Sequence, residues 1–123
     1  MTQWLAIAAG GAVGAVSRYA ISMGAARWLG ATFPWGTLIV NLTGCLLLGM
    51  LAEWSQQQQT LSADIQKLLS VGFLGALTTF STFAHETFRL AENDRLGLAM
   101  ANAGLNLGLG LLAVWAGISW MRK

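Results

Sequence analysis

Four apolar segments, each long enough to cross a lipid bilayer, follow one another along this chain of 123 residues. A helix needs about 20 predominantly apolar residues to span the hydrocarbon core of a membrane. The segments run from Trp4 to Trp28, from Phe33 to Trp54, from Ile65 to Leu90 and from Leu96 to Met121. The gaps between them are short and polar. We therefore expect residues 1–123 to form a single all-α integral membrane domain of four transmembrane helices.

The distribution of charge and tryptophan agrees with a membrane protein. Charged residues make up 10% of the chain, whereas a soluble domain carries about 25%. Trp4 and Trp28 bracket the first segment, and Trp35 and Trp54 bracket the second. Tryptophan is enriched where a helix meets the membrane–water interface. The few basic residues are needed at these membrane ends, so the net charge of +2 does not indicate a nucleic-acid partner.

The polar gaps carry turn and capping signals. Pro34 suits the first turn of the second helix, where its missing N–H needs no partner. Ser62 can cap the third helix, because its hydroxyl can accept from the first free backbone N–H groups. Residues 55–60 are predicted to form a polar loop, and residues 92–95 the last turn.

Basic residues are divided evenly between the two ends of the predicted bundle. On the side of the N-terminus lie Lys67, Arg122 and Lys123, and on the other side lie Arg27, Arg89 and Arg95. Membrane proteins are oriented by an excess of Lys and Arg on the cytoplasmic side. With no excess, we predict that the chain inserts both ways round and acts as an antiparallel homodimer. A fixed orientation set by another detail is the alternative.

The centre of the third segment is unusually polar and glycine-rich for its depth. Residues 72–83 read GFLGALTTFSTF, with four hydroxyl side chains beside three phenylalanines. Lipid offers no partner to free backbone groups, so irregular backbone at this depth lines protein or a water-filled path. We interpret this stretch as a helix broken near its middle that builds an ion or solute site. The alternative is a continuous helix whose hydroxyls bond back to the preceding turn.

Amide and aromatic side chains recur at helical spacing on the other segments. Asn41 lies near the middle of the second segment, with Thr37 four residues earlier on the same face. Asn102 and Asn106 share a face of the fourth segment, and on the third Phe80 and Phe83 share one beside Thr79, Thr82 and Glu86. Taken singly, the amides suit hydrogen bonds between helices and the rings suit packing. Together they favour an anion path.

Arg18 is a basic residue inside the first segment. A charged side chain at the centre of a membrane helix costs about 2.5–3.5 kcal/mol on insertion scales. Arg18 could line an aqueous vestibule and attract anions there. It could instead extend its side chain to the interface.

The chemistry of these groups explains how an anion could pass. Amides and hydroxyls donate hydrogen bonds, and an aromatic ring presents a positive edge. Such groups admit a small anion without trapping it, as permeation requires. Backbone carbonyls freed at a break around residues 75–78 are acceptors and would suit a structural cation such as Na⁺.

Three motifs resemble those of one family over essentially the whole chain. They are residues 11–19 (GAVGAVSRY), 36–44 (GTLIVNLTG) and 72–83 (GFLGALTTFSTF). In order and spacing they resemble the Fluc (CrcB) family of bacterial fluoride channels. The resemblance implies passive export of fluoride across the bacterial cytoplasmic (inner) membrane, which protects the cell from fluoride toxicity. It also implies a dual-topology homodimer with two pores and one Na⁺ at its interface.

The resemblance assigns roles to individual residues. Asn41 and the ring edges of Phe80 and Phe83 would contact fluoride, and the carbonyls of Gly75 and Thr78 would hold the Na⁺. Arg18 would face the aqueous vestibule. The predicted pore also includes the hydroxyl and amide side chains of Thr37, Ser81, Thr82, Asn102 and Asn106.

The fourth segment departs from the family pattern. Its polar track often carries a tyrosine and serines, and here Asn102 and Asn106 stand in their places. Since asparagine also donates hydrogen bonds, we expect conduction to persist at an altered rate. Glu86 is placed near the pore exit, and His85 is interpreted as a polar residue on the helix face.

Three other functional classes fit less well. A small multidrug exporter would need a buried acid in the first helix, which carries Arg18 instead. A membrane assembly subunit would need packing motifs such as Gly10/Gly14 and Gly104/Gly108, but not buried donors. An enzyme would need a nucleophile–base pair or a cluster of metal ligands, and neither is visible in the sequence.

Overall fold

The computed structural model describes residues 2–57 and 62–122, and these form four long apolar helical spans joined by short turns. The first two spans are α1 (Thr2–Leu29) and α2 (Trp35–Gln57). The third consists of α3 (Ala63–Lys67), η1 (Leu68–Leu74), α4 (Gly75–Leu77) and α5 (Phe80–Glu92). The fourth consists of α6 (Leu96–Gly104), η2 (Leu105–Leu109) and α7 (Gly110–Met121). The prediction of an all-helical protein with four possible membrane spans is therefore confirmed.

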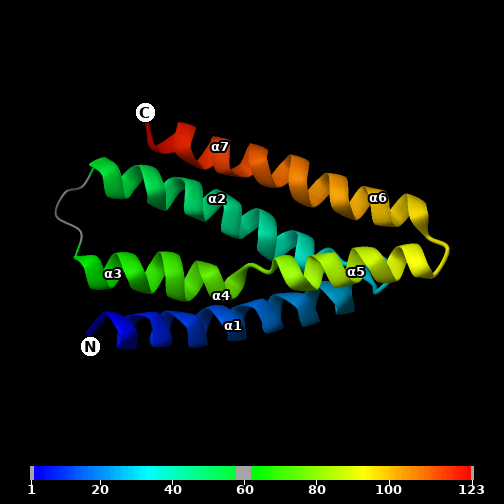
Figure 1. Cartoon of the computed structure of the whole chain (residues 1–123), viewed down its shortest axis with the longest axis horizontal. Coiled ribbons are helices and arrows are strands. Elements are labelled where there is room, and N and C mark those ends of the chain that lie inside the picture. The colour runs from blue at the N-terminus through cyan, green and yellow to red at the C-terminus, as the bar shows by residue number, and fades with distance from the viewer. Residues whose placement is uncertain (1, 58–61, 123) are drawn as a thin grey trace.

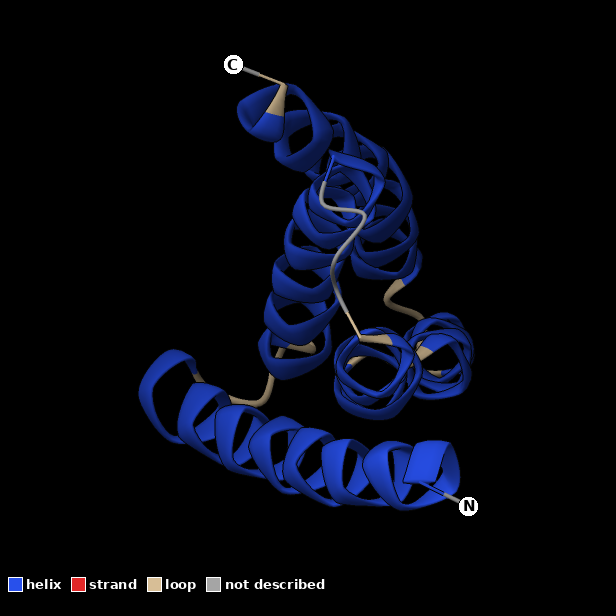
Figure 2. Ribbon diagram, turned by 90° about the vertical axis from the view of Figure 1, so that its left-hand side faces the viewer, coloured by secondary structure: helices blue, strands red, loops and turns tan. Residues whose placement is uncertain are grey.

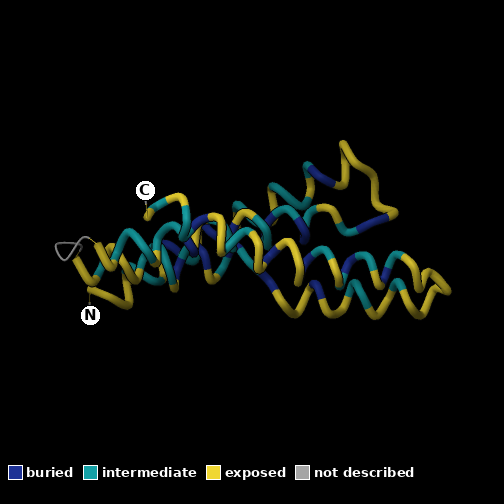
Figure 3. Tube along the Cα trace, turned by 90° about the horizontal axis from the view of Figure 1, so that it is seen from above, coloured by how far each residue is buried: buried dark blue, intermediate teal, exposed yellow. Residues whose placement is uncertain are grey.

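The spans run back and forth, so that both ends of the described chain lie at one end of the bundle (Figure 1). The most extensive contacts join α2 with α7 and α1 with η1, followed equally by α1 with α2 and α5 with α6. Seen from the end, α1 crosses beneath the other helices at an angle (Figure 2). The buried centre is small and consists of Val40, Leu74 and Leu77. Exposed segments continue along the length of every span (Figure 3), as in a helix that faces lipid or another copy.

Glycines set the distance between α1 and the third span. A Cβ atom on Gly10 would collide with the carbonyl oxygen of Leu68, and one on Gly14 with that of Phe73. From the other side, a Cβ on Gly72 would lie 2.7 Å from the carbonyl oxygen of Ile7. The prediction that Gly10 and Gly14 form a close helix contact is confirmed, since only residues without a side chain permit this approach.

We expect Gly14→Ala to lower the free energy of unfolding by about 1–3 kcal/mol, because the added methyl group must push α1 away from the third span. Gly11→Ala is the matched control, since a Cβ at Gly11 meets nothing within 4 Å. Thermal unfolding of the two variants in detergent tests this. Equal melting temperatures for both variants would contradict the close contact.

A second close glycine contact joins α2 to α7, at Gly49 and Gly117. A Cβ on Gly49 would collide with the Val114 carbonyl oxygen, and one on Gly117 with that of Leu46. By contrast, a Cβ on Gly104 or Gly108 meets nothing within 4 Å. The close approach that Gly104 and Gly108 permit is therefore not used among the described residues, because both glycines are exposed on the fourth span.

The helix ends follow the capping signals with two differences. The Ser62 hydroxyl accepts from the backbone N–H of Ile65 at 3.3 Å, which confirms the predicted cap. Pro34 lies one residue before α2 rather than in its first turn, and its carbonyl accepts from the Leu38 N–H at 3.2 Å. Of the loop predicted at residues 55–60, residues 55–57 continue α2. Residues 58–60, like Lys123, lie outside the described part of the chain.

Candidate functional site

The third span changes conformation at two adjacent threonines. Helix α4 ends at Leu77 and α5 begins at Phe80. Between them Thr78 has φ −82° and ψ 157°, and Thr79 has φ −153° and ψ 115°, both extended conformations. The first residue of this segment still belongs to the preceding turn, because the Thr78 N–H donates to the Leu74 carbonyl at 3.1 Å.

Side chains replace two backbone acceptors at this segment. In a continuous helix each N–H would donate to the carbonyl four residues earlier. Instead, the Thr79 N–H donates to Oδ1 of Asn41 at 2.8 Å, and the Thr82 N–H donates to Oγ1 of Thr79 at 3.2 Å. The carbonyls of Gly75 and Thr78 thus lose the donors that a continuous helix would supply. Two acceptor oxygens become available at mid-span.

The side-chain amide of Asn41 on α2 hydrogen-bonds to both backbone groups of Thr79. While its Oδ1 accepts from Thr79, its Nδ2 donates to the Thr79 carbonyl at 3.2 Å and to Oδ1 of Asn106 at 2.9 Å. Gly44, one turn further along α2, allows the contact, since a Cβ there would collide with Cγ2 of Thr78. The backbone of Thr79 is therefore held by Asn41 on α2, which is in turn hydrogen-bonded to Asn106 on the fourth span.

The hydrogen bonds continue along the fourth span and return to α5. Nδ2 of Asn106 donates to the carbonyl and to Oδ1 of Asn102, each at 3.0 Å. Nδ2 of Asn102 donates to Oγ1 of Thr87 at 2.8 Å, and that hydroxyl donates to the Phe83 carbonyl at 2.7 Å. The sequence reasoning missed Thr87. Its spacing of four residues from Phe83 was the available signal.

A cavity of about 300 Å³ opens beside the extended segment. Its lining includes Asn41, Gly75, Thr78, Phe80, Phe83 and Asn106. The two phenylalanine rings are tilted by 58° with centroids 5.5 Å apart. Phe83 is buried, whereas Phe80 is 75% exposed within the single chain. The structure thus brings the amides, both rings and the two carbonyl-bearing residues to one cavity.

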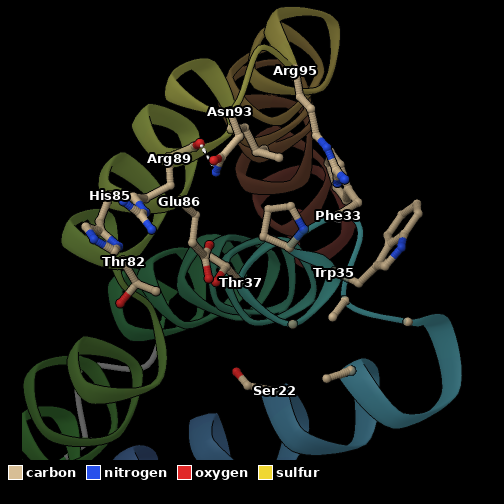
Figure 4. A pocket seen from close by; sticks show the side chains of 16 residues that line it. Ser22, Phe33, Trp35, Thr37, Thr82, His85, Glu86, Arg89, Asn93 and Arg95 are labelled. Carbon is tan, nitrogen blue, oxygen red and sulfur yellow. Dashed lines mark hydrogen bonds between the residues drawn. The ribbon is translucent and has the colours of Figure 1, made fainter.

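A larger cavity of about 870 Å³ lies between α1, the start of α2 and α5. Thr37, Thr82, His85 and Glu86 line its inner part, and Arg89, Asn93 and Arg95 line it farther along α5 and the turn to α6 (Figure 4). The Glu86 side chain extends toward Thr37 in this view. Oε2 of Glu86 is buried and has no hydrogen-bond partner among the described residues.

Three predicted site residues line neither of these cavities, namely Arg18, Ser81 and Asn102. Arg18 is half-buried on α1 and lines neither of them. Ser81 is exposed on the first turn of α5, with Oγ 3.4 Å from Oγ1 of Thr79. Thr37 and Thr82 line the larger cavity, while Asn41 and Asn106 line the smaller. The pore residues predicted from sequence therefore fall into two groups rather than along one continuous cavity in the single chain.

These features define a multi-pass membrane protein with a polar site at mid-span, as is typical of proteins that move solutes or ions. Residues 5–118 match the family described as "CrcB-like protein, Camphor Resistance (CrcB)". The chain belongs to this family. Membership agrees with the expectation of a transport protein rather than an enzyme.

Curated relatives match along the full chain. One from Geobacter sulfurreducens is 43% identical over 123 residues, which cover 100% of this chain and 99% of the relative. One from Dehalococcoides mccartyi is 44% identical over 117 residues, covering 95% of this chain and 90% of the relative. One from Methylococcus capsulatus is 46% identical over 118 residues, covering 96% of this chain but 52% of the relative. Each is named "Fluoride-specific ion channel FluC".

Proposed function

We propose that this protein is a fluoride-selective channel that lets cytoplasmic fluoride leave passively through the bacterial inner membrane. The observation that carries the proposal is its full-length similarity to relatives named fluoride-specific ion channels. Fluoride enters a cell as neutral HF and is released there as the anion, which the membrane retains. A passive path for the anion then relieves fluoride toxicity without energy input.

The smaller cavity is the proposed fluoride site. Fluoride is a strong hydrogen-bond acceptor, and Asn41, whose amide group can donate two hydrogen bonds, lines this cavity. The rings of Phe80 and Phe83 line the same cavity, and their positive edges can assist an anion without holding it tightly. The amide therefore recognises the ion, and the rings allow it to leave.

The larger cavity is the proposed aqueous approach to that site. Arg89 and Arg95 line it and would raise the local concentration of anions. Thr37 and Thr82, deeper inside, offer hydroxyl donors toward the narrow part of the path. In this proposal Arg18 contributes its charge to a vestibule that is completed by a second copy of the chain.

The proposed assembly is an antiparallel homodimer with two pores and one structural Na⁺ at the interface. The residues fit such an ion, because the Gly75 and Thr78 carbonyls have lost their helical donors to Asn41 and Thr79 side chains. Carbonyls of interrupted membrane helices are the groups that bind Na⁺ in transport proteins. Two copies would supply four of them. The cation would offset the cost of holding an anion in a dry path.

The even division of basic residues predicts that both orientations occur in one membrane. We expect Ser55→Cys, at the end of α2, to be labelled by membrane-impermeant thiol reagents from both sides. The half-buried Cys45 on α2 is replaced by alanine in the parent, so that only the new thiol reacts. Labelling from one side alone would exclude dual topology while leaving the channel proposal intact.

The first test of function is anion efflux from proteoliposomes that contain the purified protein. Valinomycin carries the balancing K⁺ current, and a fluoride electrode follows the released ion. Rapid fluoride loss, without comparable chloride loss and without an imposed proton gradient, is the expected result. Efflux that needs a proton gradient would indicate coupled transport. No efflux from a folded dimer would favour an assembly subunit.

A further inference from the structure

Four side chains near the smaller cavity form a chain of hydrogen bonds that runs in one direction. We call the side chains of Asn41, Asn106, Asn102 and Thr87 the amide relay. The bonds begin at the Thr79 N–H and end at the Phe83 carbonyl, and each member of the relay accepts from the group before it and donates to the group after it. The relay therefore has a defined polarity, with an acceptor oxygen of Asn106 facing Asn41.

This polarity leaves Asn41 without a free donor for an anion. Its amide has two hydrogens, and these are directed to the Thr79 carbonyl and to Oδ1 of Asn106. A fluoride ion that binds Asn41 must therefore displace one of these acceptors. The Thr79 carbonyl belongs to the backbone, whereas the Asn106 oxygen is on a side chain that can rotate. Asn106 is the partner that can leave.

Asn106 cannot turn without affecting its neighbours, because most of its surroundings are protein. Asn106 is 9% exposed and Asn102 is 0% exposed. Leaving a buried polar group without a partner costs about 1–3 kcal/mol. If Asn106 turned alone, its oxygen would face two acceptors, the carbonyl and Oδ1 of Asn102. A change at Asn106 must therefore be matched at Asn102, and then at Thr87.

A concerted reversal of Asn106, Asn102 and Thr87 removes the repulsion between the two amide oxygens. A half-turn of Asn106 and of Asn102 exchanges the oxygen and nitrogen of each amide, and the Thr87 hydroxyl can rotate from the Phe83 carbonyl to Oδ1 of Asn102. The Asn106 oxygen then still faces the backbone carbonyl of Asn102, a cost that binding of the anion must offset. Asn102 then donates to Oδ1 of Asn106, and the Asn106 NH₂ group faces the cavity. Asn106 changes from an acceptor that repels an anion into a second donor that binds it.

We propose that fluoride binding beside Asn41 reverses the amide relay, and that Thr87 is the positioning residue that makes reversal possible. This inference rests on the proposed channel function. Thr87 does not line the smaller cavity, and its hydroxyl is connected to that cavity through Asn102 and through the carbonyl of Phe83. A hydroxyl is required at this end because it can both accept from Asn102 and donate to it.

The test compares Thr87→Val with Thr87→Ser in the proteoliposome efflux assay. Valine keeps the shape of threonine but can neither accept from Asn102 nor donate to it, so Asn102 loses its partner at this end in both orientations of the relay. We expect Thr87→Val to slow fluoride efflux about tenfold, in line with one lost buried hydrogen bond. Thr87→Ser retains the hydroxyl and should conduct as the unaltered protein does. Equal efflux from both variants would overturn the relay and leave the channel intact.

A spectroscopic measurement on the unaltered dimer keeps the proposal testable if Thr87→Val does not fold. Fluoride is titrated into protein carrying ¹⁵N-labelled asparagine, and the side-chain amide signals of Asn102 are followed. We expect saturating fluoride to shift these signals, and chloride to leave them unchanged. Signals that stay in place in a protein that conducts fluoride would overturn the relay. A protein that does not conduct fluoride at all would instead overturn the proposed function, and the relay with it.

Discussion

Asn41→Asp is expected to abolish fluoride efflux. Aspartate keeps the oxygen that accepts from the Thr79 N–H, so the extended segment retains this contact. It loses both amide hydrogens, and its charge then faces the Thr79 carbonyl, Oδ1 of Asn106 and any anion in the cavity. Placing like charges together costs several kcal/mol. Because each 1.36 kcal/mol is a factor of ten in rate, we expect a loss of at least about a hundredfold.

Gln56→Glu is the matched control for this variant. It makes the same change from amide to carboxylate on the same helix, at an exposed position that lines neither cavity. The measurement is fluoride efflux at neutral pH, with size-exclusion chromatography to establish that each variant remains assembled. We expect the control to conduct normally. Efflux retained by folded Asn41→Asp would remove Asn41 from the anion path.

The four spans could be predicted because each is encoded locally. Length and apolar composition define a membrane helix without knowledge of its neighbours, and Ser62 marks a helix start through its own hydroxyl. The largest difference at a helix end is at α2, which continues to Gln57 into the expected loop. A polar residue at a membrane surface is compatible with a helix or a loop, so composition alone does not locate that end.

The partners of the polar groups could not be predicted, because they depend on how the spans are placed against each other. Sequence spacing puts Asn102 and Asn106 on one face, but it does not reveal that Asn106 accepts from Asn41. Thr87 resembles any hydroxyl that bonds back to its preceding turn until Asn102 is placed against it. Gly104 and Gly108 carry the same spacing as Gly10 and Gly14, yet in the described part of the chain only the earlier pair lies close against another span.

The conformation of the third span depends both on its local sequence and on its contact with another span. Thr78 and Thr79 are β-branched residues, which favour extended backbone over helix. Their position at mid-span is stabilised only because Asn41 and the Thr79 hydroxyl take over two backbone N–H groups. Without those acceptors, buried N–H groups would favour a continuous helix. The polar sequence thus indicates the region, and the contact with α2 decides which residues leave the helix.

Replacing Phe80 or Phe83 with isoleucine is the second change for which we expect a large effect. Isoleucine remains apolar but has no aromatic edge to assist an anion, so each substitution should slow fluoride efflux about tenfold. The two variants should differ in their unfolding temperatures. Phe83 is 7% exposed and loses packing when it is shortened, whereas Phe80 is 75% exposed in the single chain. We expect only Phe83→Ile to unfold at a lower temperature in a monomeric preparation.

Phe88→Ile supplies the comparison that assigns the effect to the cavity. Phe88 lies on the same helix as the other two rings and is 65% exposed, but it does not line the smaller cavity. The Phe88→Ile variant should conduct fluoride at the rate of the unaltered protein. If all three variants slow efflux equally, the effect comes from the aromatic content of α5 rather than from the path. If neither Phe80→Ile nor Phe83→Ile changes efflux, their rings serve packing alone. A loss confined to these two positions would leave ring edges at the cavity as the physical cause, because size, polarity and helix are shared with the control.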